Sequence, residues 1–189
     1  GLGEVDAFPF VDPPDTRLVS DGYRLLAELE AVDGSRHITP LGRRLARLPV
    51  DPRLARVLVE AHRFGALAEI LTLVSVLSIQ DPRERPLSAQ AQADAAHARF
   101  ADARSDFTAL LDLWNAWQEV RRTRSASQSR RWAREGYLSA ARMREWEELR
   151  GQLAGIVAEF DWTPNESPAT TEAVHRSLLP GLLGGIGQL

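Results

Sequence analysis

The chain has 189 residues, a net charge of −3, and 44 % apolar and 26 % charged residues, a composition typical of a globular protein with its own core. It contains no cysteine, which excludes disulfides and thiolate metal sites, and none of its apolar runs reaches the roughly 18 residues of a membrane span. Its 23 basic residues are all arginine, so a phosphate-binding P-loop, which needs a lysine, is excluded as well.

The N-terminal part has the pattern of a small winged helix. Residues 1–15 contain three prolines and four acids and predict an extended entry strap. Apolar residues recur at helical spacing over residues 16–32, and after a short turn residues 36–38 predict one short strand. Thr39, followed by a proline, is placed to cap a second helix. Helix, small hairpin and helix over residues 16–50 therefore predict a degenerate winged helix.

Residues 51–160 consist almost entirely of helix patterns. Asp51 is placed to cap the first of these helices, because the following proline needs no N–H partner at that position. Pro82 and Pro86 fix an extended loop between the second and third helices. The predicted helices are 51–64, which Gly65 closes, then 66–79, 88–103, 105–120 and one long helix over 134–160. The sequence thus predicts a mainly α chain, a small winged helix followed by a helical bundle, with a last helix within residues 161–189.

Two of these helices carry an apolar face. In the first, five residues predict one buried stripe: Phe107, Leu110, Leu111, Trp114 and Trp117. In the long helix the corresponding residues are Met143, Trp146, Leu149, Leu153, Ile156 and Phe160. Helical periodicity places Tyr137, Arg144 and Glu148 on the opposite, polar side of the long helix. Arg142 lies beside the apolar stripe. Because a buried unpaired guanidinium is costly, its side chain must extend to solvent, pair with an acid or contact nucleic acid, and we expect the pairing, a structural role.

Basic residues are concentrated in one segment, residues 121–134, which has no acid and a local charge of +6. Its arginines are Arg121, Arg122, Arg124, Arg130, Arg131 and Arg134. Serine and arginine together are poor core formers, so the stretch 121–131 predicts an interruption between helices. The segment is either a phosphate-contacting loop and helix start, with Trp132 available for stacking, or a solvated loop.

Catalytic and metal-binding patterns are missing from the sequence. The four histidines are scattered without ligand spacing, and no nucleophile motif or Asp-Glu-Ala-His segment is present. We therefore expect no catalytic residue, no metal site and no bound cofactor in this chain. We also expect a cytoplasmic protein without membrane contact.

Several motifs occur together in a fixed order. Phe8-Pro9-Phe10 is followed by Asp-Pro-Arg at 51–53 and again at 81–83, then by Ser105-Asp106-Phe107 and by the segment from Tyr137 to Trp146. This arrangement resembles the accessory region of DEAH-box RNA helicases, and the bacterial HrpA type in particular. The resemblance covers about residues 8 to 160.

The resemblance implies a winged helix over 16–50, a helical ratchet domain over 51–160, and a C-terminal helix over 161–189 that leads towards an OB-fold. The longer protein would be an ATP-dependent 3′-to-5′ RNA helicase whose two RecA-like motor lobes hold ATP and Mg. The long helix would border the channel for single-stranded RNA, with Arg144 contacting phosphate and Tyr137 stacking on a base. The region would couple movement of the motor lobes to translocation of the strand.

Two alternatives remain at this stage. Arg43, Arg44 and Arg47 on the second helix are compatible with a winged-helix regulator that binds duplex DNA. The helical bundle is also compatible with a scaffold that binds only proteins.

Overall fold

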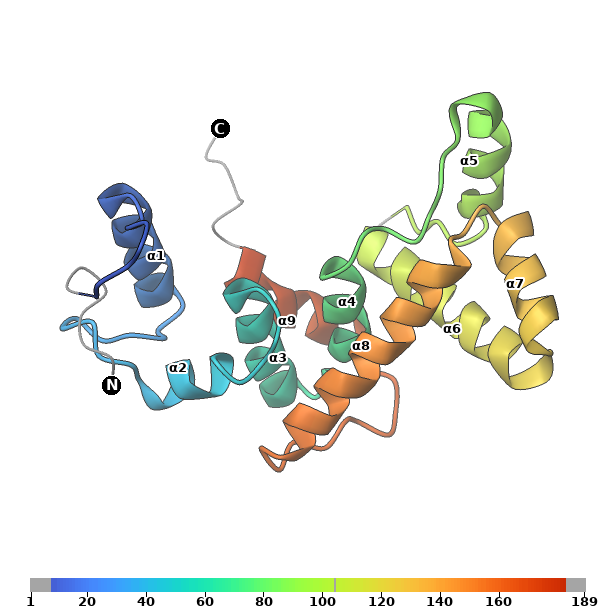
Figure 1. The fold of residues 1–189 in the computed structure, drawn as a ribbon. Coiled ribbons are helices and arrows are strands. Elements are labelled where there is room, and N and C mark those ends of the chain that lie inside the picture. The colour runs from blue at the N-terminus through green and yellow to red at the C-terminus, as the bar shows by residue number, and fades with distance from the viewer. Residues whose placement is uncertain (1–7, 104, 183–189) are drawn as a thin grey trace.

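The computed structural model describes residues 8–103 and 105–182, an elongated arrangement of helices (Figure 1). Within these residues no β-strand is formed, and the two β-bridges, Val32–Ile38 and Arg83–Leu138, are isolated. The mainly α prediction, with a small winged helix followed by a helical bundle, is confirmed. Of the predicted entry strap, residues 8–15 are irregular, and residues 1–7 lie outside the described part of the chain.

The winged helix consists of α1 (Thr16–Glu28), a turn closed by the Val32–Ile38 bridge, and α2 (Pro40–Leu45). The strand predicted over residues 36–38 is reduced to that one bridge, because hydrogen bonds from the backbone N–H groups of Ser35 and His37 to the Asp33 carboxylate close the turn tightly. Thr39 caps α2 as predicted: its Oγ1 accepts from Gly42 N at 2.9 Å.

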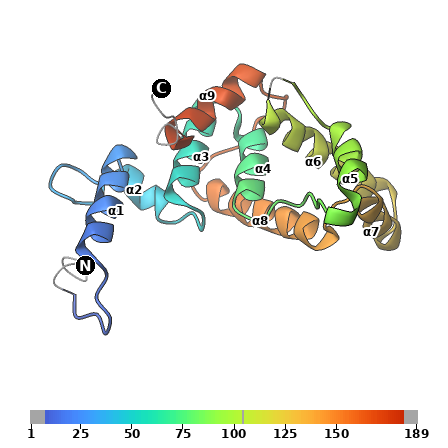
Figure 2. The ribbon, with the colours of Figure 1, turned by 90° about the horizontal axis from the view of Figure 1, so that it is seen from above.

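The helix α4 (Leu67–Leu77) is the centre of the bundle. Within residues 67–76 all side chains except Ala68 and Glu69 are buried. Figure 2 shows α4 surrounded by α3 (Pro52–Phe64), α6 (Asp106–Thr123), α8 (Ala140–Ala158) and α9 (Thr171–Leu182). Because every neighbour buries its apolar face against this helix, the bundle has one shared core.

The start of α4 is capped from a distant part of the chain. Ala66 at its N-cap has no side-chain acceptor, and instead Asn165 Oδ1 accepts from Ala68 N at 2.9 Å. The Glu69 carboxylate in turn accepts from Asn165 Nδ2 at 3.0 Å and from Ala169 N at 2.9 Å. These bonds fasten the loop before α9 to the central helix.

The caps predicted for α3 are confirmed. The Asp51 carboxylate accepts from Arg53 N at 2.8 Å at its start, and Gly65 ends it in the left-handed conformation with φ of 65°.

The predicted interruption at 121–131 is wrong in its extent: only Arg124 and Ser125 separate two helices, and the rest of this stretch is helical. Helix α6 continues to Thr123, and α7 (Ala126–Glu135) begins almost at once. The reason is a capping box, in which Ser125 Oγ accepts from Gln128 N and the Gln128 side chain accepts from Ser125 N. Local capping thus offsets the weak core-forming tendency of a Ser- and Arg-rich stretch.

The single long helix predicted over 134–160 is also wrong, because the chain breaks between α7 and α8. Tyr137 has φ of 52°, and Leu138 forms the bridge with Arg83. Glu84 N donates to Tyr137 O and Ser139 N donates to Pro82 O, both at 2.8 Å. The backbone here pairs with the proline-fixed loop instead of continuing the helical ladder.

Between that loop and α6 lie a short 3₁₀ turn, η2 (Leu87–Ala89), and α5 (Gln90–Ala98), which projects from the bundle (Figure 1).

The two tryptophans of the facing stripes differ in burial. Trp146 on α8 is fully buried, and its Nε1–H donates to Thr72 O at 2.9 Å. Trp114 on α6 is only half-buried, at 5.0 Å from the Trp146 ring, so the stripe predicted as buried on α6 is buried only in part.

The contact between α3 and α9 depends on Gly181. A Cβ at this position would lie 2.4 Å from Arg53 O and 2.5 Å from Val57 Cγ2. Gly151 and Gly155 on α8 are different, since nothing lies within 4 Å of a Cβ at either position.

We expect Gly181→Ala to lower the free energy of unfolding by about 1–3 kcal/mol, because α9 must move away from α3. Gly151→Ala, the matched control, should raise it by about 0.5–1 kcal/mol, since alanine loses less backbone entropy in a helix. Urea denaturation followed by circular dichroism measures both. Equal changes in the free energy of unfolding for the two substitutions would contradict the close approach of α9 to α3 at Gly181.

Candidate nucleic-acid interface

Three of the six arginines in the basic segment are paired with carboxylates. Glu119 and Glu135 lie just outside residues 121–134 along the chain, and Glu147 comes from α8. The pairs are Arg122 with Glu119 at 2.8 Å, Arg131 with Glu135 at 2.7 Å, and Arg121 with Glu147 at 3.4 Å. The hydrogen bond from Arg122 lowers the pKa of Glu119. The local charge of +6 in the sequence is therefore halved in the structure.

The other three arginines, Arg124, Arg130 and Arg134, are exposed. Their side chains have no hydrogen bond or ion pair with any residue that the structure describes. Arg130 and Arg134 are one turn apart on α7, and Arg124 directly precedes the capping residue of that helix. Three guanidinium groups, two on α7 and one just before its cap, are thus available to an external anion.

Tyr137 does not share a helix face with Arg144, because it lies in the connection between α7 and α8. Its carbonyl accepts from Glu84 N at 2.8 Å and from His97 Nε2 at 3.0 Å, and its side chain is partly buried. The backbone of Tyr137 holds the proline-fixed loop and α5 against the bundle. Its predicted stacking on a base stays a prediction.

Arg144 is exposed on α8, and its side chain has no hydrogen bond or ion pair with any described residue. Glu145 and Glu148 are exposed on the same side of the helix, so this face has mixed charge. The nearby carboxylates weaken the attraction of Arg144 for a phosphate, so its predicted phosphate contact has less electrostatic support than contacts by the unpaired arginines of the basic segment. Arg142 donates to the backbone carbonyl of Asp81 at 3.0 Å, so it has a structural partner as predicted, although the partner is not an acidic side chain.

Arg150 was assigned no role by the sequence patterns, yet it has the most distinctive surroundings of the arginines on α8. Its Nε–H donates to Thr72 Oγ1 at 2.9 Å, and its guanidinium lies over the Trp114 ring at 5.4 Å. Burial lowers the pKa of Arg150, and the charge of Glu69 opposes this shift. Two features of the sequence indicate Arg150: its place between Leu149 and Leu153 of the apolar stripe, and the resemblance of residues 149–153 to the DEAH-box pattern of an Arg and a Gln flanked by apolar residues.

Arg47 links the winged helix to the bundle. It forms an ion pair with Glu159 and lies over the Phe160 ring at 4.6 Å. Phe160 contacts Trp162 edge-on at 5.2 Å, and Trp162 stacks on His62 at 5.0 Å. Arg47 is thus engaged within the protein, and Arg43 donates to Ile38 O at 3.3 Å, so of the three arginines that favoured a DNA-binding regulator only Arg44 is without a described partner.

Within residues 8–103 and 105–182, no cluster of three or more His, Asp or Glu side chains could hold a metal ion. Every helix in the same ranges is too short or too polar to cross a membrane.

Two adjoining family profiles match the chain. The profile described as "Helicase associated domain (HA2), winged-helix" matches residues 23–50, and that described as "Helicase associated domain (HA2), ratchet-like" matches residues 51–139. The chain belongs to the helicase-associated family. The profiles meet at the Asp51 cap of α3, and the limits predicted at residues 15 and 160 stay predictions.

Relatives of this helicase-associated chain are RNA helicases. It is 46 % identical over 192 residues to the ATP-dependent RNA helicase HrpA of Escherichia coli (strain K12). It is 44 % identical over 194 residues to the HrpA homolog of Haemophilus influenzae, and both matches cover 99 % of this chain. A third relative is the pre-mRNA-splicing factor ATP-dependent RNA helicase prp22 of Schizosaccharomyces pombe, at 29 % over 188 residues. The predicted resemblance to the HrpA type is confirmed.

The helicase-associated chain spans only 15–16 % of the length of these relatives. Their names therefore describe proteins much longer than this chain.

The Arg47–Phe160 contact predicts a measurable coupling between the two parts of the helicase-associated chain. In a double-mutant cycle of Arg47→Ala and Phe160→Ala, we expect a coupling free energy of about 0.5–1 kcal/mol. Urea denaturation of the four proteins provides it. The same cycle with Arg44→Ala, an exposed arginine next to α2's end, should show no coupling. A coupling near zero for Arg47 would mean that water screens the contact completely.

Proposed function

We propose that this chain is the accessory region of an ATP-dependent 3′-to-5′ RNA helicase, where it borders the channel for single-stranded RNA. The family membership and the names of the relatives support an RNA helicase as the parent protein. Two RecA-like motor lobes of that parent would bind ATP and Mg, and an OB-fold would complete the channel. No group in this chain takes part in the hydrolysis.

The observation that carries the RNA contact is the division of the basic segment into paired and unpaired arginines. Arg124, Arg130 and Arg134 have no described partner and are exposed on or beside one helix. Single-stranded RNA is recognised largely through such cations along its backbone, with bases free to stack. Because Arg121, Arg122 and Arg131 are paired with carboxylates, we expect the phosphate contacts at the three unpaired arginines instead.

Coupling to the motor is supported by the way the parts are joined. The loop before α9 is bonded to the start of α4, and α8 packs along α4, so a displacement at either end meets a closely packed core. We infer that the winged helix passes movement of the motor lobes to α8 through Arg47 and the aromatic residues it contacts.

A comparison of two triple variants tests the RNA contact. Replacing Arg124, Arg130 and Arg134 with Ala should reduce the slope of log affinity against log salt by about two units, at roughly 0.7 per phosphate contact. The matched control replaces Arg121, Arg122 and Arg131, which removes the same net charge. The control should leave most of the slope in place, because those side chains are held by carboxylates.

The affinity is measured by fluorescence anisotropy of a labelled single-stranded RNA of mixed sequence, at several KCl concentrations between about 50 and 200 mM. If the slope of log affinity against log salt falls equally in both triple variants, the binding depends on net charge alone and the proposed interface is contradicted. Affinity unaffected by salt in the unmodified chain would contradict the proposed function and favour a protein-binding scaffold.

The isolated chain should not hydrolyse ATP, with or without RNA, because it contains no lysine for a P-loop. Phosphate release in a coupled assay should equal that of buffer. Turnover that persists through repurification and disappears on a substitution within residues 1–189 would contradict this expectation.

A further inference from the structure

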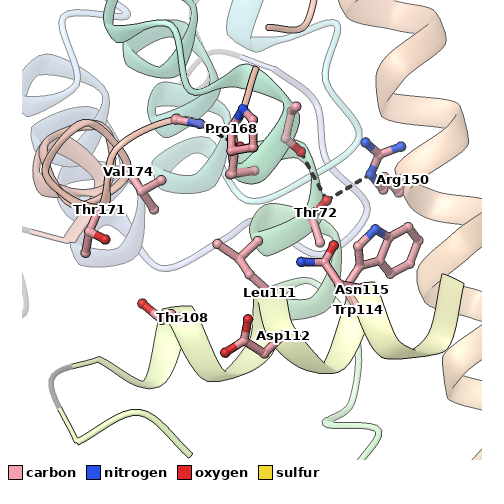
Figure 3. A pocket seen from close by; sticks show the side chains of 13 residues that line it. Thr72, Thr108, Leu111, Asp112, Trp114, Asn115, Arg150, Pro168, Thr171 and Val174 are labelled. Atoms are coloured by element: carbon pink, nitrogen blue, oxygen red, sulfur yellow. Dashed lines mark hydrogen bonds between the residues drawn. The ribbon is translucent and has the colours of Figure 1, made fainter. Parts of the chain in front are cut away.

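A cavity of about 330 Å³ lies between four elements of the bundle, beyond the arginines of α7 (Figure 3). Its walls come from α4, α6, α8 and α9, the last together with the loop that leads into it. Figure 3 shows Arg150 and Thr72 at one end, with Trp114, Asn115, Leu111 and Asp112 following along α6. The volume is at the lower end of the range for ligand pockets, about 300–1,000 Å³, which suits a ligand of nucleoside size.

Arg150 has unused hydrogen-bonding capacity at one end of this cavity. Its Nε–H donates to Thr72 Oγ1, but neither terminal amino group has a hydrogen-bond partner among the described residues. The Glu69 carboxylate accepts from Asn165 Nδ2 and Ala169 N and forms no ion pair with Arg150 in the described structure. A partly desolvated guanidinium with free donors favours an acceptor that can take both amino groups, which is the geometry of a phosphate or carboxylate.

The α6 side of the cavity offers a different chemistry. Asp112 and Asn115 are exposed, three residues apart, and neither side chain has a partner in the part of the chain that the structure describes. A carboxylate accepts from an exocyclic amino group of a base, and an amide both donates and accepts at a base edge. Leu111, Trp114 and Val174 supply apolar walls between these polar groups and Arg150.

We propose that this cavity binds a single ribonucleotide unit, with its phosphate on Arg150 and an amino-bearing base edge on Asp112 and Asn115. The unit is either a free nucleotide or one nucleotide of a bound strand, and the second case rests on the proposed function. The site is separate from Arg124, Arg130 and Arg134, so the two can be tested independently.

Titration of the 189-residue chain with cytidine monophosphate, followed by NMR of the indole N–H groups, tests the proposal. The Trp114 resonance, assigned with Trp114→Phe, should shift on addition of the nucleotide. Uridine monophosphate lacks the exocyclic amino group and should bind about tenfold more weakly, within the discrimination of one good base-edge pair. Inorganic phosphate and cytidine alone should each bind more weakly than the complete nucleotide.

Variants separate the two ends of the site. Asp112→Ala should abolish the preference for the cytidine over the uridine nucleotide. Arg150→Gln should remove binding, and its matched control is Arg17→Ala, an exposed arginine of α1 that does not line the cavity and should leave binding unchanged. Arg150 also contacts Thr72 and Trp114, so its variant could unfold. Asp112 and Asn115 are exposed, so their variants should fold and still test the base-edge contact.

Three results would overturn the proposal: no shift at Trp114 with millimolar nucleotide, equal affinity for the two nucleotides, or glutamate binding as tightly as cytidine monophosphate. The last would indicate a carboxylate site for a peptide.

Strand binding without nucleotide binding would overturn this proposal and leave the proposed function intact. Nucleotide binding in a chain that binds no strand at any salt concentration would support the cavity and contradict the proposed function. Retention of nucleotide binding in the Arg124, Arg130 and Arg134 triple variant would support two separate sites.

Discussion

Burial of α4 is the constraint on which the rest of the bundle depends. Residues 70–76 of this helix are entirely buried, and each of α3, α6, α8 and α9 covers part of its surface. At about 25 cal/mol per Å² of buried apolar surface, such a helix supplies much of the driving force for folding. Its polar groups are also used for assembly: Thr72 O accepts from the Trp146 indole, and its start is capped by Asn165. A helix this apolar cannot stay in water, so the four others must assemble around it.

The candidate interface follows from this arrangement. Packing α6 and α8 on α4 brings Glu147 within 3.4 Å of Arg121, which removes one arginine from the surface available to RNA. The same packing places Arg150 between Thr72 and Trp114, far along the chain from both. The polar groups available to a ligand are therefore those left after the core has formed, and not those that are densest in the sequence.

Local signals allowed much of the fold to be predicted. Asp51, Thr39 and Gly65 act within one or two turns of the chain, so their capping roles could be read directly and are observed. The helix break at Tyr137 could not, because the backbone there is held by the loop containing Pro82 and Glu84, more than fifty residues earlier. The helical start of α7 was not predicted for another reason: the Ser- and Arg-rich composition of the segment indicated a loop, although the Ser125–Gln128 capping box favours a helix start.

By itself, the amino-acid sequence determined the helical content, the caps and the family resemblance, because these depend on neighbouring residues and on motifs in a fixed order. It also determined that no lysine-based phosphate loop can exist in the chain. Only the tertiary structure decided which arginines are neutralised, where Arg47 is engaged, and that Arg150 lines a cavity. Ion pairing acts over a few ångströms in space whatever the separation along the chain, so charge patterns become binding surfaces only after the helices have packed.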